Sequence, residues 1–323
     1  MYLSVLVPVF NEAESLPHLL EQIAHALAPL SKPFEVICVD DGSNDGSFDV
    51  LRELTSQYPM LRAVQLRRNF GQTAAMQAGL DLSEGSFVAF LDADLQNDPA
   101  DIPRMLSHLI EHDLDMVAGW RSDRQDKLLS RRLPSVIANR LISATTKVRL
   151  HDYGCSLKVM TADTAKQLRL YGEMHRFIPA IANWDGARIA EMPVNHRARQ
   201  FGVSKYGLSR TIRVVLDLMV VLFVQKFRSK PMQVFGLMGI LSTCVGIGVC
   251  AWLAADKLIN GASLANRPLL LLGALLIVVG IQLLSTGLVA DLLSRTYYES
   301  QDKRAYSIRR EYRSDEVSGY SNE

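Results

Sequence analysis

Five continuous apolar runs of strand length recur along the first part of the chain, separated by longer segments of mixed polarity. Unbroken runs of Val, Ile, Leu and Phe are what a strand needs when both of its faces are covered. The intervening segments are long enough for helical crossovers, so the pattern predicts an α/β domain with a mostly parallel sheet. The expected strands are Leu3–Val9, Phe34–Asp40, Leu61–Leu66, Ser86–Asp92 and Asp115–Trp120.

Two longer segments, about 233–254 and 268–290, contain no charged residue. Each is close to the ~20 residues that a helix needs to cross a bilayer, so we predict two transmembrane helices joined by a short loop. In the second segment Gly273, Gly280 and Gly287 recur at every seventh position. Small residues allow close helix contact in lipid, so this face is a candidate for the contact between the two spans or between subunits.

The stretch before the first span sets Arg210, Arg213 and Asp217 against apolar side chains. This pattern predicts an amphipathic helix in the plane of the membrane interface; a helix packed on the soluble domain is the alternative. Basic residues flank the pair of spans and are few in the loop between them. Both termini and the soluble domain are therefore expected on the cytoplasmic side of an inner or plasma membrane. The expected boundaries are a soluble domain at 1–205, an interfacial region at 206–230, a transmembrane hairpin at 231–293 and a cytoplasmic tail at 294–323, loose after about residue 302.

Composition narrows the class of protein. A formal net charge of +1 gives no overall basic field, so nucleic acid is not expected as a partner. The four cysteines form no CxxC pair, which indicates a reducing compartment without a disulfide framework or a zinc site. The first apolar run begins at Leu3 and leaves no room for a charged leader, so no secretory signal is expected.

Acids gather at the carboxyl ends of the expected strands, where sheets of this kind bind ligands. Asp92 and Asp94 would point to one face at the end of the fourth strand, and a hard divalent cation could relieve their repulsion. Glu12, Asp40 and Asp41 follow the first two strands and can accept hydrogen bonds from a base or a ribose. An ordinary acidic turn explains any one of these groups alone. Their joint occurrence favours a nucleotide site.

These segments, in this order, resemble the motifs of glycosyltransferase family 2. Downstream motifs extend the resemblance to the family's polyisoprenyl-phosphate branch, which includes dolichol-phosphate mannose synthases and bacterial undecaprenyl-phosphate sugar transferases. The resemblance covers about residues 3–230 and implies the nucleotide-sugar-binding GT-A fold. It rests on VPVFNE, VDDGSNDGS, RNFGQ and LDADLQNDP, followed by DYGCSLKVM, RFIP and RQFGVSKYG.

The resemblance also implies roles for residues on the donor side of the site. Pro8, Glu12 and Asp41 would contact the nucleoside of the donor. Asp92 would contact the ribose or the metal, and Asp94 the metal, which would be Mg²⁺ or Mn²⁺. Such a cation could bridge a nucleotide diphosphate and stabilise the charge that develops as it leaves.

On the acceptor side, Asp152 matches the acid near the reacting centre of the family. A phosphate monoester has a second pKa of about 6 and is already largely anionic at neutral pH, so a strong general base is not required. We therefore predict that Asp152 positions the acceptor or the sugar and removes a proton only from the minority monoanion. Bringing two anions to one carbon needs cations. The candidates for acceptor or phosphate binding are Arg121, Arg199, Ser204 and Lys205.

Together these features predict a membrane-bound inverting glycosyltransferase. It would move a sugar, with a UDP-sugar as first choice, to undecaprenyl phosphate on the cytoplasmic leaflet, giving a lipid-phosphate-linked sugar for glycan or lipid modification. A GDP-mannose-dependent enzyme like dolichol-phosphate mannose synthase is the alternative within the class. A non-catalytic membrane scaffold that binds a nucleotide sugar is the alternative outside it. The expected partners are the nucleotide sugar, the polyisoprenyl phosphate and membrane lipid, and a homo-oligomer is compatible with the glycine face.

Two further enzyme classes fit the sequence less well. A processive polysaccharide synthase would carry a Gln-x-x-Arg-Trp motif, which this chain lacks, and two spans are too few for a translocation channel. A nucleotidyltransferase would carry a glycine-rich basic loop after its first strand, where this chain has FNEAES.

Overall fold

The computed structural model describes residues 1–122, 150–170, 172, 174–198, 231–261, 268–299 and 306–313. The chain divides into two compact units. One unit comprises Met1–Met219 together with Ala305–Glu323, and the other comprises Val220–Arg304. The predicted interfacial helix at 206–230 lies outside the described residues.

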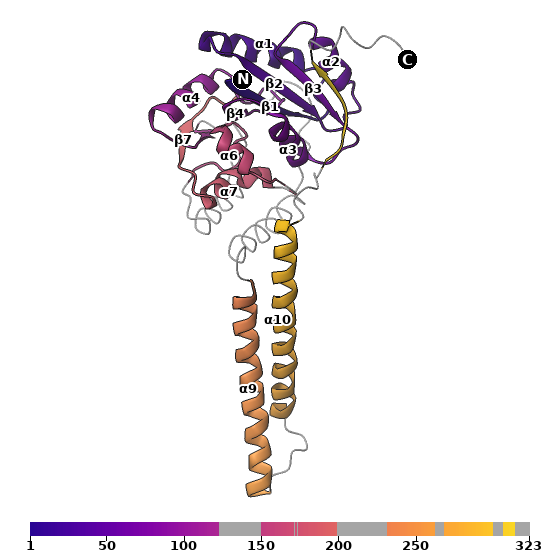
Figure 1. Ribbon diagram of the computed structural model, residues 1–323, viewed down its shortest axis with the longest axis vertical. Coiled ribbons are helices and arrows are strands. Elements are labelled where there is room, and N and C mark those ends of the chain that lie inside the picture. Colours follow the sequence, from indigo (N-terminus) through magenta and orange to yellow (C-terminus); the bar gives the residue numbers. More distant parts are fainter. Residues whose placement is uncertain are drawn as a thin grey trace. The chain divides into compact units, whose positions relative to one another are not determined.

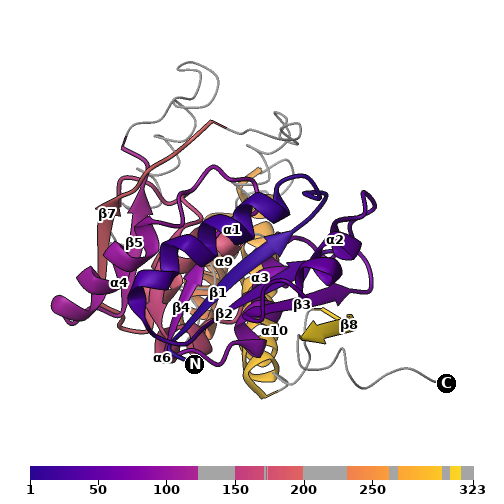
Figure 2. The ribbon, with the colours of Figure 1, turned by 90° about the horizontal axis from the view of Figure 1, so that it is seen from above.

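The first unit is built on a mixed sheet with the strand order β7-β5-β6-β4-β1-β2-β3-β8 (Figures 1 and 2). The pairings β1–β2, β1–β4, β2–β3 and β5–β7 are parallel, and β3–β8, β4–β6 and β5–β6 are antiparallel. The parallel order of β4, β1, β2 and β3 brings their carboxyl ends to one edge of the sheet. The strands are β1 (Leu3–Val9), β2 (Phe34–Asp40), β3 (Leu61–Leu66), β4 (Phe87–Phe90), β5 (Met116–Trp120), β6 (Lys158–Thr161), β7 (Ile189–Pro193) and β8 (Ile308–Arg313).

The predicted strands are present, three of them with the expected bounds. β4 ends at Phe90, two residues before Asp92, and the chain turns at Ala93 and Asp94. β6 and β7 were not predicted. They have four and five residues, too few to show a hydrophobic period.

Helices cover both faces of this sheet, with α1 and α2 on one side and α3, α6 and α7 on the other (Figure 1). Alternate residues of β1 divide between the two layers. Leu3, Val5 and Val7 belong to the core that includes the buried side chains of α1, α2 and α4. Leu6 points to the other face, where its side chain lies next to Gly79 of α3. The helices are α1 (Leu16–Leu27), α2 (Ser47–Leu54), α3 (Gln72–Leu82), α4 (Asp101–Glu111), α6 (Ala162–Gln167) and α7 (Ile178–Trp184), with short 3-10 helices at Ala28–Leu30 and Met174–Phe177.

The prediction of a loose tail after about residue 302 is wrong for residues 308–313, which form β8 at the edge beyond β3 (Figure 2). The segment IRREYR is too highly charged to show the apolar pattern from which a strand could be predicted. Glu311 accepts a 2.5 Å hydrogen bond from Nε of the buried Arg62 on β3, and Tyr312 packs against Phe48 with ring centroids 5.9 Å apart. Glu311 thus pairs with the buried cation of β3, while Arg309 and Arg310 are exposed, as is usual for charged residues of an edge strand.

The second unit is a pair of long helices, α9 (Pro231–Asn260) and α10 (Pro268–Glu299), which pack side by side (Figure 1). Both are long and apolar enough to cross a membrane, with mean hydropathy of 2.0 over Phe235–Asn260 and 2.4 over Pro268–Ala290. These are the two spans that the sequence predicted.

The predicted glycine face of α10 is where α9 and α10 meet. A Cβ added to Gly239 would lie 2.7 Å from the carbonyl oxygen of Gly280, and one added to Gly246 would lie 2.6 Å from that of Gly273. Glycines spaced by seven on both helices therefore let the two backbones touch.

Candidate active site

Hydrogen bonds tie together the loops that follow β1 and β2. The backbone N–H of Asn11 donates to Ser43 Oγ and that of Glu12 to Ser47 Oγ, both at 2.9 Å. The Glu12 carboxylate accepts a hydrogen bond of 3.3 Å from the Ser15 hydroxyl. Glu12, which was predicted to contact the nucleoside, thus lies in a half-buried loop that these hydrogen bonds hold. Pro8, also predicted, lies in β1 near the start of this loop.

Asp41 fixes the loop that follows β3. Its carboxylate is buried and accepts hydrogen bonds from the backbone N–H of Phe70 at 2.7 Å and of Gly71 at 2.9 Å. Burial raises the pKa of Asp41, while these two N–H groups favour its charged form. The neighbouring Asp40 is also buried and accepts a bond of 3.2 Å from the Ser43 N–H. Asp41, which was predicted to contact the nucleoside, therefore fixes the backbone of the loop after β3.

Asp92 and Asp94 lie in the turn between β4 and α4, beyond the end of the strand in which an i, i+2 pair was expected. Gln72, at the start of α3, donates to Asp92 Oδ1 at 3.0 Å, and the N–H of Gln96 donates to Asp94 Oδ1 at 3.1 Å. Burial, and then the charge of Asp94, raise the pKa of Asp92 to about 6. The charge of Asp94 therefore acts on Asp92, and a bound cation would relieve this repulsion.

The chain that follows β7 packs against this acidic turn. His196 pairs with Asn97 in an antiparallel bridge, and the Arg197 N–H donates to the Gln96 carbonyl at 2.8 Å. The Arg197 guanidinium forms an ion pair with Asp98. Arg199, Ser204 and Lys205, predicted to approach the acceptor or the phosphates, come next in the chain and lie outside the described residues.

Asp152 and Arg121, both predicted on the acceptor side, are in direct contact. Arg121 follows β5 and donates Nε to Asp152 Oδ2 at 2.6 Å and Nη2 to Asp152 Oδ1 at 3.0 Å. Burial opposes the charge of Arg121, but the hydrogen bond and the charge of Asp152, together with other nearby acidic groups such as Asp92, raise the pKa of the guanidinium above its usual value. Such a two-point pair fixes the plane of the carboxylate as well as its charge.

A buried lysine, not predicted from the sequence, stands between the acidic turn and the Asp152–Arg121 pair. Lys158 on β6 donates its ammonium to the Cys155 carbonyl. Burial lowers its pKa, while the charges of Asp92 and Asp152 favour the ammonium form. The sequence signal was a lone cation inside the apolar run SLKVM. Gln72, Asn97 and Ser156 lie within the motifs RNFGQ, LDADLQNDP and DYGCSLKVM but were given no role of their own, whereas Glu191 lies outside every quoted motif.

The acidic turn suits a hard divalent cation. Asp92 and Asp94 supply carboxylate oxygens, the ligand type that Mg²⁺ and Mn²⁺ prefer. Among the described residues, no group of three or more His, Cys, Asp or Glu side chains could hold a metal ion. Mg²⁺ commonly binds through one or two carboxylates and completes its shell with water and substrate phosphate oxygens. The residues present therefore fit a cation that binds together with a diphosphate.

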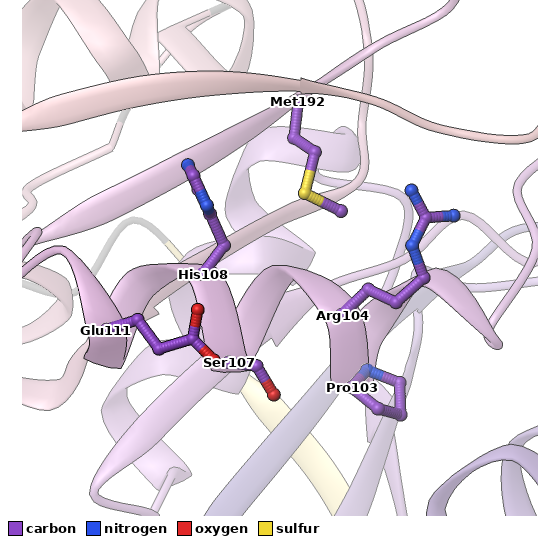
Figure 3. Close-up of a pocket in the computed structure, with 6 residues that line it drawn as sticks. All are labelled: Pro103, Arg104, Ser107, His108, Glu111 and Met192. Atoms are coloured by element: carbon purple, nitrogen blue, oxygen red, sulfur yellow. The ribbon is translucent and has the colours of Figure 1, made fainter.

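An open groove lies on the outer side of the sheet edge, between α4 and β7. Figure 3 shows Met192 of β7 directed toward the helix that carries Arg104, His108 and Glu111. None of the predicted site residues lines this groove. The acids of the strand ends therefore belong to a different part of the surface.

Comparisons with known sequences agree on one family. The profile of "Glycosyl transferase family 2" matches residues 4–169. A dodecaprenyl-phosphate galacturonate synthase of Rhizobium johnstonii is 45% identical over 95% of this chain and 92% of its own. An undecaprenyl-phosphate 4-deoxy-4-formamido-L-arabinose transferase of Edwardsiella ictaluri is 36% identical over 95% of this chain and 93% of its own. These relatives fit the branch that the motifs indicated.

Among solved structures, the chain is similar to glucosyl-3-phosphoglycerate synthase from Mycobacterium tuberculosis in complex with Mn²⁺ and uridine-diphosphate-glucose. The TM-score is 0.53 at 16% identity, covering 69% of this chain and 78% of that one. At this identity the likeness concerns the fold, and it confirms the GT-A fold that the motifs implied.

Proposed function

This chain belongs to glycosyltransferase family 2, and on that basis we propose that it transfers a sugar from a nucleotide-sugar donor to a polyisoprenyl phosphate. The observation that carries the proposal is that two groups of polar side chains follow strands of the same sheet. An acidic turn holds Asp92 and Asp94, and a fixed carboxylate and guanidinium follow at Asp152 and Arg121. The chain also contains a helical hairpin long enough to cross a membrane, which suits a lipid acceptor.

The donor would bind at the carboxyl ends of β1, β2 and β4. Glu12 and Asp41 stand at the nucleoside end, and Asp92 and Asp94 would hold the Mg²⁺ or Mn²⁺ ion. That ion would neutralise charge on the diphosphate. The synthase from Mycobacterium tuberculosis binds Mn²⁺ with UDP-glucose on the same fold, which supports a divalent metal and a uridine nucleotide as first choice.

In the proposed reaction an acceptor phosphate oxygen attacks the anomeric carbon as the bond from that carbon to the diphosphate breaks. The diphosphate leaves with the bonding electron pair, and attack from the opposite side inverts the anomeric configuration. No strong base is needed because the acceptor is already anionic at neutral pH. Asp152, held at both oxygens by Arg121, suits a positioning role better than repeated proton transfer.

The membrane part gives the proposed location. We place α9 and α10 in the bilayer of an inner or plasma membrane, with the GT-A domain and both termini on the cytoplasmic side. In the domain boundaries proposed from the sequence, the interfacial region at 206–230 follows the GT-A domain along the chain and precedes the hairpin. Undecaprenyl phosphate is the proposed acceptor, since the bacterial relatives are named for undecaprenyl- and dodecaprenyl-phosphate products.

The test is release of nucleoside diphosphate by detergent-purified full-length protein with undecaprenyl phosphate and Mg²⁺ or Mn²⁺. The donors are UDP-sugars and GDP-mannose, including the galacturonate and 4-deoxy-4-formamido-L-arabinose compounds that the names of the relatives suggest. We expect lipid-dependent release from one donor. Asp94→Asn should lower turnover by at least about 100-fold, because it removes a carboxylate that stabilises the departing charge.

Asp49→Asn is the matched control, because it removes one carboxylate from the exposed surface of α2, where the side chain is 70% exposed. Its turnover should equal that of the unchanged protein. Donor binding without a lipid-linked product from any donor would contradict the proposal and favour a binding protein. GDP-mannose as the sole donor would replace the uridine nucleotide but keep the class.

A further inference from the structure

Glu191 is a largely buried acid beside Asp152 to which none of the sequence motifs gave a role. It lies in β7, paired with Ala118 of β5 in the parallel register. Its side chain is only 9% exposed. Its neighbour Met192 points to the opposite face of β7, into the groove against α4 (Figure 3). Glu191 is therefore on the face of β7 away from that groove.

The Glu191 carboxylate holds two consecutive peptide groups of the turn that carries Asp152. Its Oε1 accepts the Asp152 N–H at 2.9 Å, and its Oε2 accepts the His151 N–H at 2.9 Å. The His151 ring nitrogen Nδ1 lies 2.8 Å from the same Oε2. The His151 ring also stacks on Trp120 of β5, with ring centroids 4.4 Å apart and planes 20° apart. One carboxylate thus fixes both the backbone and a side chain of this turn.

Two neighbouring strands consequently hold Asp152 from two sides. Arg121, just beyond β5, binds both oxygens of its carboxylate. Glu191, in β7, binds its backbone N–H. The Asp152 side chain also closes a turn of its own by accepting the Gly154 N–H at 3.0 Å. Fixing both the backbone and the carboxylate leaves Asp152 little freedom to move relative to the sheet.

We propose that Glu191 is a positioning residue for the transfer reaction, acting by holding the Asp152 turn in place. This rests on the proposed function, in which Asp152 orients the acceptor or the sugar. Small displacements of such groups are costly, since about 1 Å of misplacement can lower a rate by about 100-fold. Glu191 itself touches neither reactant; its effect passes through Asp152.

The test compares Glu191→Gln, Asp152→Asn and the double variant in full-length protein. Gln keeps the length of the side chain but offers one acceptor oxygen for two N–H groups. We expect kcat to fall by about 10- to 100-fold with the donor KM unchanged. In the double variant the loss should be no greater than that of Asp152→Asn alone, because both changes act on one group. Additive losses would overturn the proposal.

Asp115→Asn is the matched control. Asp115 precedes β5 and accepts the Arg188 N–H at 2.7 Å, just before β7, so it joins the same two strands at their other end. Its turnover should stay within about twofold of the unchanged protein. An equal loss in this variant would mean that general loosening of β5 and β7 explains the effect, which contradicts the proposal.

Amide hydrogen exchange separates this inference from the proposed function. Exchange at residues 150–154 should be faster in Glu191→Gln than in the unchanged protein and in Asp115→Asn, with or without substrates. An unchanged rate would overturn the inference even if the enzyme is active. If exchange accelerates but the unchanged protein turns over no donor, the proposed function fails and Glu191 holds the turn for another purpose.

Discussion

Acids that look alike in the sequence are held by different partners in the fold. Asp41 accepts two backbone N–H groups, and Asp152 is held by a guanidinium at both oxygens. Asp92 instead stands near another acid, and its pKa is raised to about 6. Protein donors occupy both carboxylate oxygens of Asp41 and of Asp152, whereas repulsion from Asp94 favours a cation beside Asp92. This contrast supports the proposal that Asp92 and Asp94 hold the metal.

Gly42 gives a prediction at this scale. Its φ is +70°, and an added Cβ would lie 2.6 Å from backbone atoms of Arg68 and Asn69. Gly42→Ala should therefore push apart the loops after β2 and β3, lowering the free energy of unfolding by about 2 kcal/mol or more. Donor affinity should fall with it, because Asp41 and its partners sit in these loops. Chemical denaturation and calorimetric donor titration measure the two effects.

Gly46 is the control for backbone strain alone. It has φ of +88°, but an added Cβ would meet nothing within 4 Å. Gly46→Ala should cost only about 1 kcal/mol, the penalty of the left-handed backbone. Equal losses from the two variants would show that contact with the loop after β3 has no part in the effect.

At the scale of elements, the bounds of a strand could be predicted from the sequence only where its residues are buried on both faces of the sheet. β1, β2 and β3 are buried in continuous apolar runs, so their bounds could be read directly. β7 is half-exposed, and β8 is an edge strand that carries exposed charged residues such as Arg309 and Arg310. The contact of Glu311 with Arg62 joins residues far apart in the chain, which no local pattern records.

The candidate site follows the same division. Acids at the ends of predictable strands, such as Asp92 and Asp94, could be found from position alone. Lys158 and Glu191 stand on short strands whose place in the sheet was not predicted. The turns that Lys158 and Glu191 contact depend on how β6 and β7 pair with the other strands of the sheet.

The packing of α9 on α10 gives a prediction at the scale of elements. A Cβ at Gly280 would lie 2.1 Å from Thr243 Oγ1 and 2.6 Å from the Gly239 carbonyl oxygen. Gly280→Val should therefore separate the helices and destabilise the hairpin by about 1–3 kcal/mol. Denaturant titration in mixed micelles measures this loss.

The control is Gly248→Val, which places the same side chain where nothing lies within 4 Å, so it should have little effect. Equal destabilisation would contradict a glycine contact between α9 and α10.

At the scale of the whole molecule, the chain leaves the GT-A domain, forms the helical hairpin and returns to complete the sheet. β8 follows α10 in sequence yet pairs with β3, and the Tyr306 hydroxyl donates to Asp81 of α3 at 2.8 Å. The C-terminal segment is therefore part of the core domain, although it comes after both membrane helices. Its removal should harm the GT-A domain without deleting either helix.

A stop after Ala305 tests this. It removes the antiparallel partner of β3, and it leaves the Arg62 side chain, 9% exposed, without the Glu311 carboxylate. Arg62 keeps the Leu82 carbonyl oxygen at 2.9 Å and the Glu84 carboxylate at 3.7 Å, but the loss of its shortest charged contact should cost about 1–3 kcal/mol. Together with the lost strand pairing, this should lower the melting temperature of the GT-A domain by at least about 5 °C. The exposed edge of β3 should also promote aggregation.

The control Arg309→Ala/Arg310→Ala changes two exposed side chains and keeps the strand, so it should melt like the unchanged protein. If the truncated protein melted at the same temperature as this control, the pairing of β8 with β3 would contribute nothing to stability, and the segment would be the dispensable tail that its charge suggested.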